Sequence, residues 1–318
     1  MVPIEIINRS DFYKDTIYKT NQGYYIKILK YFNSANVFVE FLNTKYKYTT
    51  NTTIDHIKSG KIGYPYHYKE LYENTVWKTN EGYDIKILEY VDRNNIKIIF
   101  IYNNIILEKC RLDHIRDGKI KNPYHKNAYG GYIGIGKYTS TGIYENIYSC
   151  WYSMLQRTIK DPAYENVYIC QEWYNYQNFA EWYYSKISLL NPEFDYELDK
   201  DIKQIEKIQK YYGPNTCCLV PKELNISLSH LYQKRYNKNI PVGVFKYKDK
   251  FKVLISINGI IHYYGIYNTI DEAFNAYYIN KISYIKKLAK KYYENNGLIY
   301  EDYIEILNLK ILPYKKEN

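Results

Sequence analysis

The sequence holds few cysteines and few arginines, and it lacks any long apolar run. Its five cysteines form no Cys-x-x-Cys motif among the 318 residues. This usage excludes a disulfide scaffold, and we expect reduced thiols in a cytosolic protein. The adjacent Cys217 and Cys218 are expected to pack inside a strand, with zinc binding as the alternative. Without a signal peptide or an apolar run of transmembrane length, we expect no membrane partner.

Arginine contributes only six of the 44 basic residues, which oppose 34 acidic ones and leave a net charge of +10. A positive surplus favours a polyanionic partner. The 44 tyrosines accompany much lysine, isoleucine and asparagine, a usage typical of an AT-rich genome. Tyrosine content by itself therefore does not indicate a base-stacking surface. The length suffices for two or more domains with their own cores.

An internal repeat organises the first part of the chain. Residues 19–29 (KTNQGYYIKIL) match residues 78–88 (KTNEGYDIKIL), and residues 55–62 match residues 113–120. Alternating apolar residues around asparagine-rich turns predict strands in both copies. We expect two small β-rich modules, residues 1–68 and 69–127. The repeated histidine and lysine residues are typical of solvated surface.

A glycine-rich joint and two helices are expected next. Residues 129–138 contain four glycines but no Gly-Lys-Ser/Thr ending, so we interpret them as a flexible linker that runs into a short strand. Apolar residues at helical spacing predict a helix over residues 144–159, and a second helical stretch carries Trp173, Phe179 and Trp182. The default role of these aromatic side chains is core packing.

Carboxylates, a turn and an amide come together after residue 196. Residues 198–202 are predicted as a strand, residues 212–215 as a turn around Gly-Pro-Asn, and residues 216–220 as a returning strand before a helix that starts near Pro221. Alternate residues of a strand share a face, so three carboxylates would project together and suit Mg²⁺, whereas Lys200 would point away from its neighbours. The alternative is a solvated acidic edge. The three carboxylates belong to Glu197, Asp199 and Asp201.

A run of marked residues precedes this unit: Trp151, Met154 and Arg157 at helical spacing, then Tyr164, then CQEWYNYQNFAEW over residues 170–182. With these residues, the segment 148–225 resembles the HNH (ββα-metal) family of phage-encoded endonucleases. In that family an Asp-His pair supplies a metal ligand and the general base, a hairpin Asn holds the loop or metal, and a last Asn or His completes the site. The resemblance puts four residues at these catalytic positions, in the same order: Asp199, Lys200, Thr216 and Asn225.

Two of these positions depart from the family pattern. A histidine near neutral pKa can accept a proton at pH 7, whereas an ordinary lysine, with a pKa of about 10.4, is already protonated. Lys200 at the base position and Thr216 at the amide position therefore indicate a degenerate centre. Mg²⁺, with Asp199 and Asp201 as ligands, is expected only if the centre is functional.

The last segment, residues 231–318, is basic. Residues 242–248, 251–257 and 260–265 predict a three-stranded meander with an Asn258-Gly259 turn, and Thr269 to Glu272 form a capping box that opens a long helix. The alternation places Phe251, Val253, Ile255 and Ile257 against Ala273, Ala276 and Tyr277, with Lys252, Leu254 and Ser256 outside.

This segment resembles the Apetala-two (ethylene-response-factor) DNA-binding domain, through Gly243-Val244, Lys250-Phe251, Tyr264-Gly265, Glu272-Ala273 and Ala276-Tyr277. That family lays its sheet in the major groove and reads bases largely with arginine and tryptophan. The outward positions here lack arginine, so we expect phosphate contacts and weak selectivity. The alternative is a basic solvated sheet. The expected DNA contacts are Lys246, Tyr247, Lys248, Lys252, Ser256 and Tyr263.

Together these patterns predict an α+β multidomain protein: two β-rich repeats, an HNH-like ββα domain (128–230), and a three-stranded antiparallel sheet plus helix (231–318). The function expected is binding of double-stranded DNA by a phage or mobile-element protein with a degenerate endonuclease centre. Two alternatives stay open: an active Mg²⁺-dependent homing or nicking endonuclease, and a non-catalytic phage structural or host-interaction protein. We expect a cytoplasmic location, in the host cell if the chain is phage-encoded; a virion component is a further option.

Overall fold

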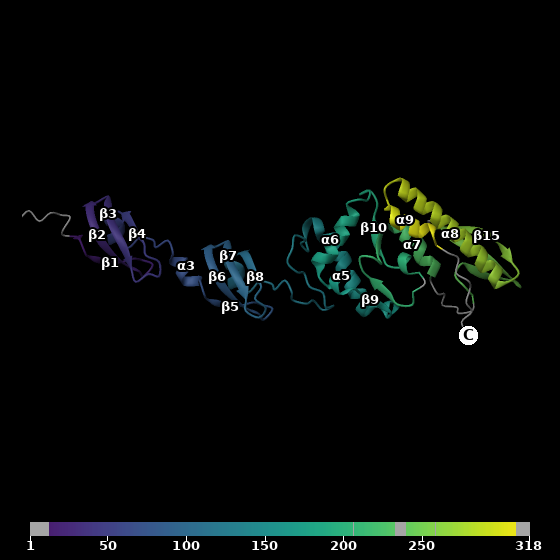
Figure 1. Ribbon diagram of the computed structural model, residues 1–318, viewed down its shortest axis with the longest axis horizontal. Coiled ribbons are helices and arrows are strands. Elements are labelled where there is room, and N and C mark those ends of the chain that lie inside the picture. The colour runs from purple at the N-terminus through teal and green to yellow at the C-terminus, as the bar shows by residue number, and fades with distance from the viewer. Residues whose placement is uncertain (1–12, 206, 233–239, 258, 310–318) are drawn as a thin grey trace, which may run out of the picture. The chain divides into compact units, whose positions relative to one another are not determined.

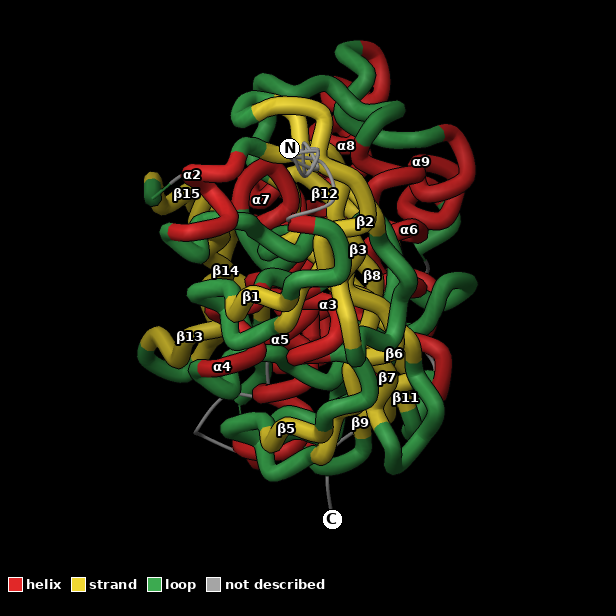
Figure 2. The backbone as a smooth tube through the Cα atoms, turned by 90° about the vertical axis from the view of Figure 1, so that its left-hand side faces the viewer, coloured by secondary structure: helices red, strands yellow, loops and turns green. Residues whose placement is uncertain are grey.

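The computed structural model describes residues 13–205, 207–232, 240–257 and 259–309 (Figure 1). Helices make up 35% of the chain and strands in several antiparallel sheets 29%, which confirms the predicted α+β class. Helices and strands are distinguished by colour in Figure 2. Contacts divide the chain into two compact units, Met1–Asn122 and Pro123–Asn318, each described here by itself. No helix in the described ranges is long and apolar enough to cross a membrane.

The first unit contains the same small fold twice. The strand order is β1-β2-β3-β4 in the first copy and β5-β6-β7-β8 in the second, antiparallel throughout, and a short helix follows each sheet. The first copy consists of β1 (Ile17–Lys19), β2 (Tyr25–Asn33), β3 (Asn36–Leu42), β4 (Thr49–Thr52) and α2 (Ile54–Lys58). The second consists of β5 (Val76–Lys78), β6 (Asp84–Asp92), β7 (Asn95–Phe100), β8 (Ile106–Cys110) and α4 (Leu112–Arg116).

Each copy buries the apolar residues that alternate along its central strands, as the pattern predicted. The buried set is Ile26, Ile28, Val37, Val39 and Phe41 in the first copy, and Ile85, Ile87, Ile96, Ile98 and Phe100 in the second. Helix α3 (His67–Tyr72) connects the copies and packs on β6. The predicted module boundary between residues 68 and 69 therefore falls inside a helix.

The repeated Lys-Thr-Asn and Gly-Lys-Ile segments have a structural explanation. The amide of Asn21 donates to the carbonyl of Gly60 at 2.8 Å, and Asn80 does the same to Gly118 at 2.8 Å. Both glycines adopt a left-handed φ, +67° and +66°, after the short helix. A side chain there would collide with the asparagine, so this residue pair fastens the first hairpin of each copy to the end of its helix.

In the second unit, the glycine-rich joint is anchored. The side-chain amide of Gln177 donates to the carbonyls of Ile133 (3.2 Å) and Tyr138 (2.8 Å), and the backbone of Tyr132 bonds Tyr174 and Tyr176. Only one isolated bridge, between Tyr132 and Asn175, occurs in this segment. The predicted strand is therefore wrong, because these backbone groups pair with the start of a helix instead of a neighbouring strand.

The predicted helix over residues 144–159 is confirmed as α5 (Glu145–Lys160), which buries Ile147, Trp151, Met154 and Leu155. It packs on α6 (Tyr176–Ile187). Short 3-10 turns, η1 (Gly142–Tyr144), η2 (Pro162–Tyr164) and η3 (Gln171–Tyr174), connect these parts. Trp173 and Phe179 are buried and belong to one aromatic core, as predicted, and the Trp182 indole nitrogen donates to the Pro214 carbonyl at 3.1 Å.

The predicted strand-strand-helix unit is present with shifted limits. Strand β10 (Tyr196–Asp199) pairs antiparallel with β12 (Cys218–Pro221), and α7 (Lys222–Tyr232) follows directly. The first strand thus ends three residues before the predicted Ile202, which begins η4 (Ile202–Gln204). The long hairpin also contains β11 (Lys210–Tyr212), which pairs in parallel with β9 (Val167–Ile169) and was not predicted. Cys217 and Cys218 are buried, as expected, and all five thiols are free.

The C-terminal sheet joins β13 (Val244–Tyr247), β14 (Lys250–Ile257) and β15 (Ile260–Tyr267) in the predicted meander; Asn258 lies outside the described residues. Helix α8 (Ile270–Glu294) opens with the predicted capping box, and α9 (Tyr300–Leu307) follows. Val253, Ile255, Ala273 and Tyr277 share one core, with Phe251, Ile257 and Ala276 at its margin, as predicted. That core also includes Val220 and Leu224, so the boundary predicted at residue 230 divides one hydrophobic cluster.

Candidate functional site

Strand β10 ends at Asp199, whose buried carboxylate accepts hydrogen bonds from the backbone. Its Oδ1 accepts hydrogen bonds from the amides of Asp201 and Ile202, both at 2.8 Å. This geometry ends the strand and starts η4. Burial, and then the nearby charge of Asp201, raise the pKa of Asp199 to about 6 although the two backbone bonds favour its ionised form.

Lys200 and Lys210 both bind Asp201. The Lys200 ammonium lies 2.9 Å from Oδ2 of Asp201, and the Lys210 ammonium contacts Oδ1 of the same carboxylate. Burial raises the pKa of Asp201, but the charges and hydrogen bonds of the two lysines outweigh burial and hold it below its ordinary value. The prediction that Lys200 points away from Asp201 is wrong. Strand alternation does not apply beyond Asp199, where the chain bends.

Two tyrosine rings surround the Lys200 ammonium. Its Nζ lies 4.7 Å from the ring centre of Tyr164 and 5.7 Å from that of Tyr212. The guanidinium of Arg157 lies over the same two rings, at 5.7 and 5.2 Å. Lys200 is only 8% exposed. Cation–π contacts with the rings stabilise both cations where water is largely excluded.

The remaining predicted catalytic residues make separate contacts. The side-chain amide of Asn225 on α7 donates to Oε2 of Glu197 at 2.6 Å. The hydroxyl of Thr216 donates to the carbonyl of Tyr211 at 2.8 Å and closes the Gly-Pro-Asn turn. Asp199, Lys200 and Asp201 are therefore adjacent in one bend, whereas Asn225 pairs with the strand and Thr216 serves the turn.

Three carboxylate oxygens of the bend already have partners. One Asp199 oxygen accepts two backbone amides, and each Asp201 oxygen has an ammonium group beside it. Mg²⁺ needs carboxylate oxygens that can turn toward it. Among the described residues, no group of three or more His, Cys, Asp or Glu side chains is placed to hold a metal ion.

The outer face of the C-terminal sheet holds most of the predicted DNA contacts. Directly opposed residues share a face, and Phe245 pairs with Lys252, Leu254 with Tyr263, and Ser256 with Ile261. Helix α8 covers the opposite face. Ile261 and Tyr263 are 68% and 61% exposed, so the outer face combines aromatic and aliphatic side chains with lysine.

Lysines dominate the hairpin between β13 and β14. Lys246, Lys248 and Lys250 are exposed, and the Nζ of Lys252 lies 5.7 Å from the ring centre of Tyr247. Asp249 is the single acid of this hairpin. Within the described ranges none of these four lysines forms an ion pair, so their charges are available to phosphate groups.

Sequence reasoning missed three residues of these sites. Lys210 and Tyr212 reach the bend through the parallel β9–β11 pair, which no local pattern indicates. Lys250 was omitted from the expected contacts although its charge and its place in the hairpin were visible. Tyr164 was noted for the resemblance alone, and the structure places its ring over the Lys200 ammonium.

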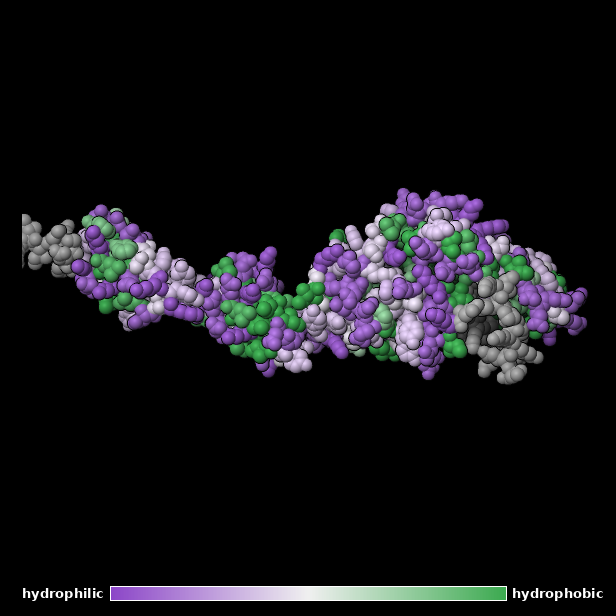
Figure 3. All heavy atoms as spheres, in the orientation of Figure 1, coloured by the Kyte–Doolittle hydropathy of each residue, from purple (hydrophilic) through white to green (hydrophobic). Residues whose placement is uncertain are grey.

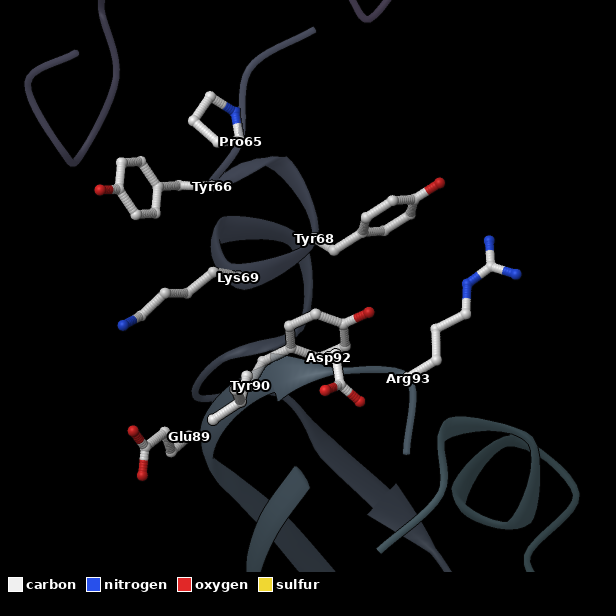
Figure 4. A pocket seen from close by; sticks show the side chains of 9 residues that line it. Pro65, Tyr66, Tyr68, Lys69, Glu89, Tyr90, Asp92 and Arg93 are labelled. Atoms are coloured by element: carbon white, nitrogen blue, oxygen red, sulfur yellow. The ribbon is translucent and has the colours of Figure 1, made fainter. Parts of the chain in front are cut away.

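A hollow in the first unit is a further candidate. It has a volume of about 510 Å³, and α3 and the end of β6 line it (Figure 4). The guanidinium of Arg93 lies 5.6 Å from the ring centre of Tyr68, and Glu89, Asp92 and Lys69 also line the hollow. The mixed charges give no preference for an anion.

Hydrophobic residues also reach the surface of the second copy (Figure 3), where Val76, Ile101 and Ile106 are exposed.

Comparison of the chain with protein-family models, with curated proteins and with solved structures found no match.

Proposed function

We propose that this protein binds double-stranded DNA with weak sequence selectivity and does not cut it. The observation that carries the proposal is the burial and pairing of Lys200, which lies at the position where the resemblance expects a general base. Its ammonium is buried, pairs with Asp201 at 2.9 Å and lies under two tyrosine rings. A general base must reach the water that it deprotonates, whereas this nitrogen contacts a carboxylate and is covered by two rings.

The lysines of the β13–β14 hairpin support the binding half of the proposal. They lie next to exposed aromatic and aliphatic side chains, and β13, β14 and β15 contain no arginine to read guanine in the major groove. Phosphate contacts of this kind give affinity that falls with salt and differs little between sequences. The five free thiols support a cytoplasmic setting for this activity.

Protein docking is a second candidate for the same sheet. The high exposure of Ile261 and Tyr263 on the outer face favours it, because contiguous apolar surface often marks a partner site. The charge of the adjoining hairpin favours DNA. Binding that resists salt and that a protein partner competes away would indicate docking.

The first experiment incubates supercoiled plasmid with the purified chain in Mg²⁺, Mn²⁺ or chelator, and scores nicking and gel shift in the same tubes. A shift without nicking under any metal is expected. Metal-dependent nicking that is lost in Asp199→Ala would overturn the non-cutting half of the proposal. The absence of both nicking and a gel shift would refute DNA binding.

The second experiment measures the salt dependence of binding to a duplex. Combined alanine replacement of Lys246, Lys248 and Lys252 should weaken binding and lower the slope of log K against log salt by about 0.9 for each lost phosphate contact. The matched control replaces three exposed lysines elsewhere in the second unit, Lys207, Lys287 and Lys291. An equal loss in both triple variants would mean that only net charge matters, which would contradict a defined hairpin site.

A further inference from the structure

A pocket of about 420 Å³ is lined by residues from the start of α7, the middle of α8 and the β14–β15 hairpin. Its lining includes Lys222, Ser227, Ser256 and Lys281. These residues come from three separate elements of the second unit. Ser256 is the one lining residue that was also predicted as a DNA contact.

Lys281 is the unusual member of this lining. It is 2% exposed, and no carboxylate pairs with it in the described part of the chain. Its Nζ lies 5.5 Å from the ring centre of Tyr284, one turn along α8. Burial lowers the pKa of Lys281, and no opposing charge restores it. A buried ammonium is costly unless a partner compensates it, and here the open space beside it can admit one.

The other polar groups of the lining suit an anionic partner. Lys222 is exposed and adds a second positive charge, and the hydroxyl of Ser227 can donate a hydrogen bond. Glu223 also lines the pocket, but its carboxylate oxygens accept from the hydroxyls of Tyr292 at 2.7 Å and Tyr284 at 3.4 Å. The carboxylate oxygens of Glu223 therefore have hydroxyl partners, and the two lysines of the lining outnumber this one carboxylate.

We propose that this pocket binds a phosphate group, with the Lys281 and Lys222 ammonium groups and the Ser227 hydroxyl as its donors. A phosphate offers several acceptor oxygens to donors that converge from different directions. The pocket volume leaves room for more than the phosphate itself, as in a nucleotide or the end of a nucleic-acid strand. This site is separate from the Asp199 bend and does not depend on the proposed DNA binding.

The test is a thermal-shift and calorimetric titration of the full chain. The probes are inorganic pyrophosphate, and a short oligonucleotide with and without a 5′-phosphate. Binding to the folded chain should raise its melting temperature. Lys281→Met keeps a long apolar side chain in place and should weaken binding roughly tenfold to a hundredfold, because a charged hydrogen bond is lost. Lys287→Met, at an exposed position of the same helix, should leave binding unchanged.

The outcomes are separable. A response to pyrophosphate supports a site for free phosphorylated molecules, and a response only to the 5′-phosphorylated oligonucleotide supports a strand-end site. Lys281→Met also removes an uncompensated buried charge, so it should melt no lower than the wild type, and a folding defect would be visible. The proposal fails if no phosphate probe shifts the wild type, or if the two methionine variants bind equally well.

Discussion

Replacement of Gly118 by alanine should destabilise the second copy of the repeat more than the same change at Gly82. Both glycines have left-handed backbone angles, with φ of +66° and +88°. A Cβ at Gly118 would lie 2.6 Å from Oδ1 of Asn80, whereas nothing lies within 4 Å of a Cβ at Gly82. The two variants therefore share backbone strain and differ in the collision.

The magnitude follows from these contacts. The left-handed conformation costs an alanine roughly 1 to 2 kcal/mol at either position. At Gly118 the Asn80 side chain must also move, which breaks its 3.1 Å hydrogen bond to the carbonyl of Asp117. A hydrogen bond of this kind contributes about 1 kcal/mol. We expect Gly118→Ala to lower the free energy of unfolding by about 1 kcal/mol more than Gly82→Ala does, with any remaining clash added to that.

Hydrogen exchange of the full chain, read at the amides of β5 to β8, measures this difference. The first copy contains the same Asn21–Gly60 arrangement and serves as an internal reference in every sample. In an Asn80→Ala background, the obstructing oxygen is absent. The cost of Gly118→Ala should then fall toward that of Gly82→Ala, as a double-mutant cycle would show.

Equal losses of protection at the β5 to β8 amides in Gly118→Ala and Gly82→Ala would refute the reasoning, since backbone strain alone would then explain both. The same conclusion would follow if removal of the Asn80 side chain left the Gly118→Ala cost unchanged. A loss of protection in β1 to β4 as large as that in β5 to β8 would show that the copies unfold together.

Two further predictions concern the bend after β10. The pKa of Asp199 is raised from 3.8 to about 6 in the folded chain, so as pH falls the folded chain binds this proton before the unfolded chain does. Protonation of Asp199 therefore stabilises the fold at low pH by about 3 kcal/mol at most, and this stabilisation is lost as pH rises through about 6. The free energy of unfolding in urea should therefore fall less between pH 4.5 and 7.5 for Asp199→Asn than for the wild type. Equal falls would contradict the raised pKa. Lys200→Met should cost about 1 to 2 kcal/mol at pH 7, because Asp201 keeps only Lys210 as partner. The control Lys207→Met, at an exposed position, should change stability by less than about 0.5 kcal/mol. Equal stabilities of Lys200→Met and Lys207→Met would contradict a stabilising Lys200–Asp201 pair.

Local patterns in the sequence determined the elements whose stabilising contacts are close in sequence or repeat in it. The helical spacing of four apolar residues identified the buried face of α5, and the capping box located the start of α8. The duplicated segments implied two β-rich copies, and alternation separated the two faces of β14. Each of these inferences needs only periodicity or capping chemistry, which a single chain displays directly.

Tertiary structure decided the features that depend on partners distant in sequence. The direction of Lys200 depends on a bend made by the Asp199 carboxylate, on Lys210 and on the rings of Tyr164 and Tyr212. The cluster that Leu224 shares with α8, and the burial of Lys281 beside a pocket, likewise arise from the packing of separate elements. The sequence by itself therefore determined which helices and strands form and which faces they bury. Only the fold decided which charges meet, because charge contacts are set by three-dimensional proximity and not by spacing along the chain.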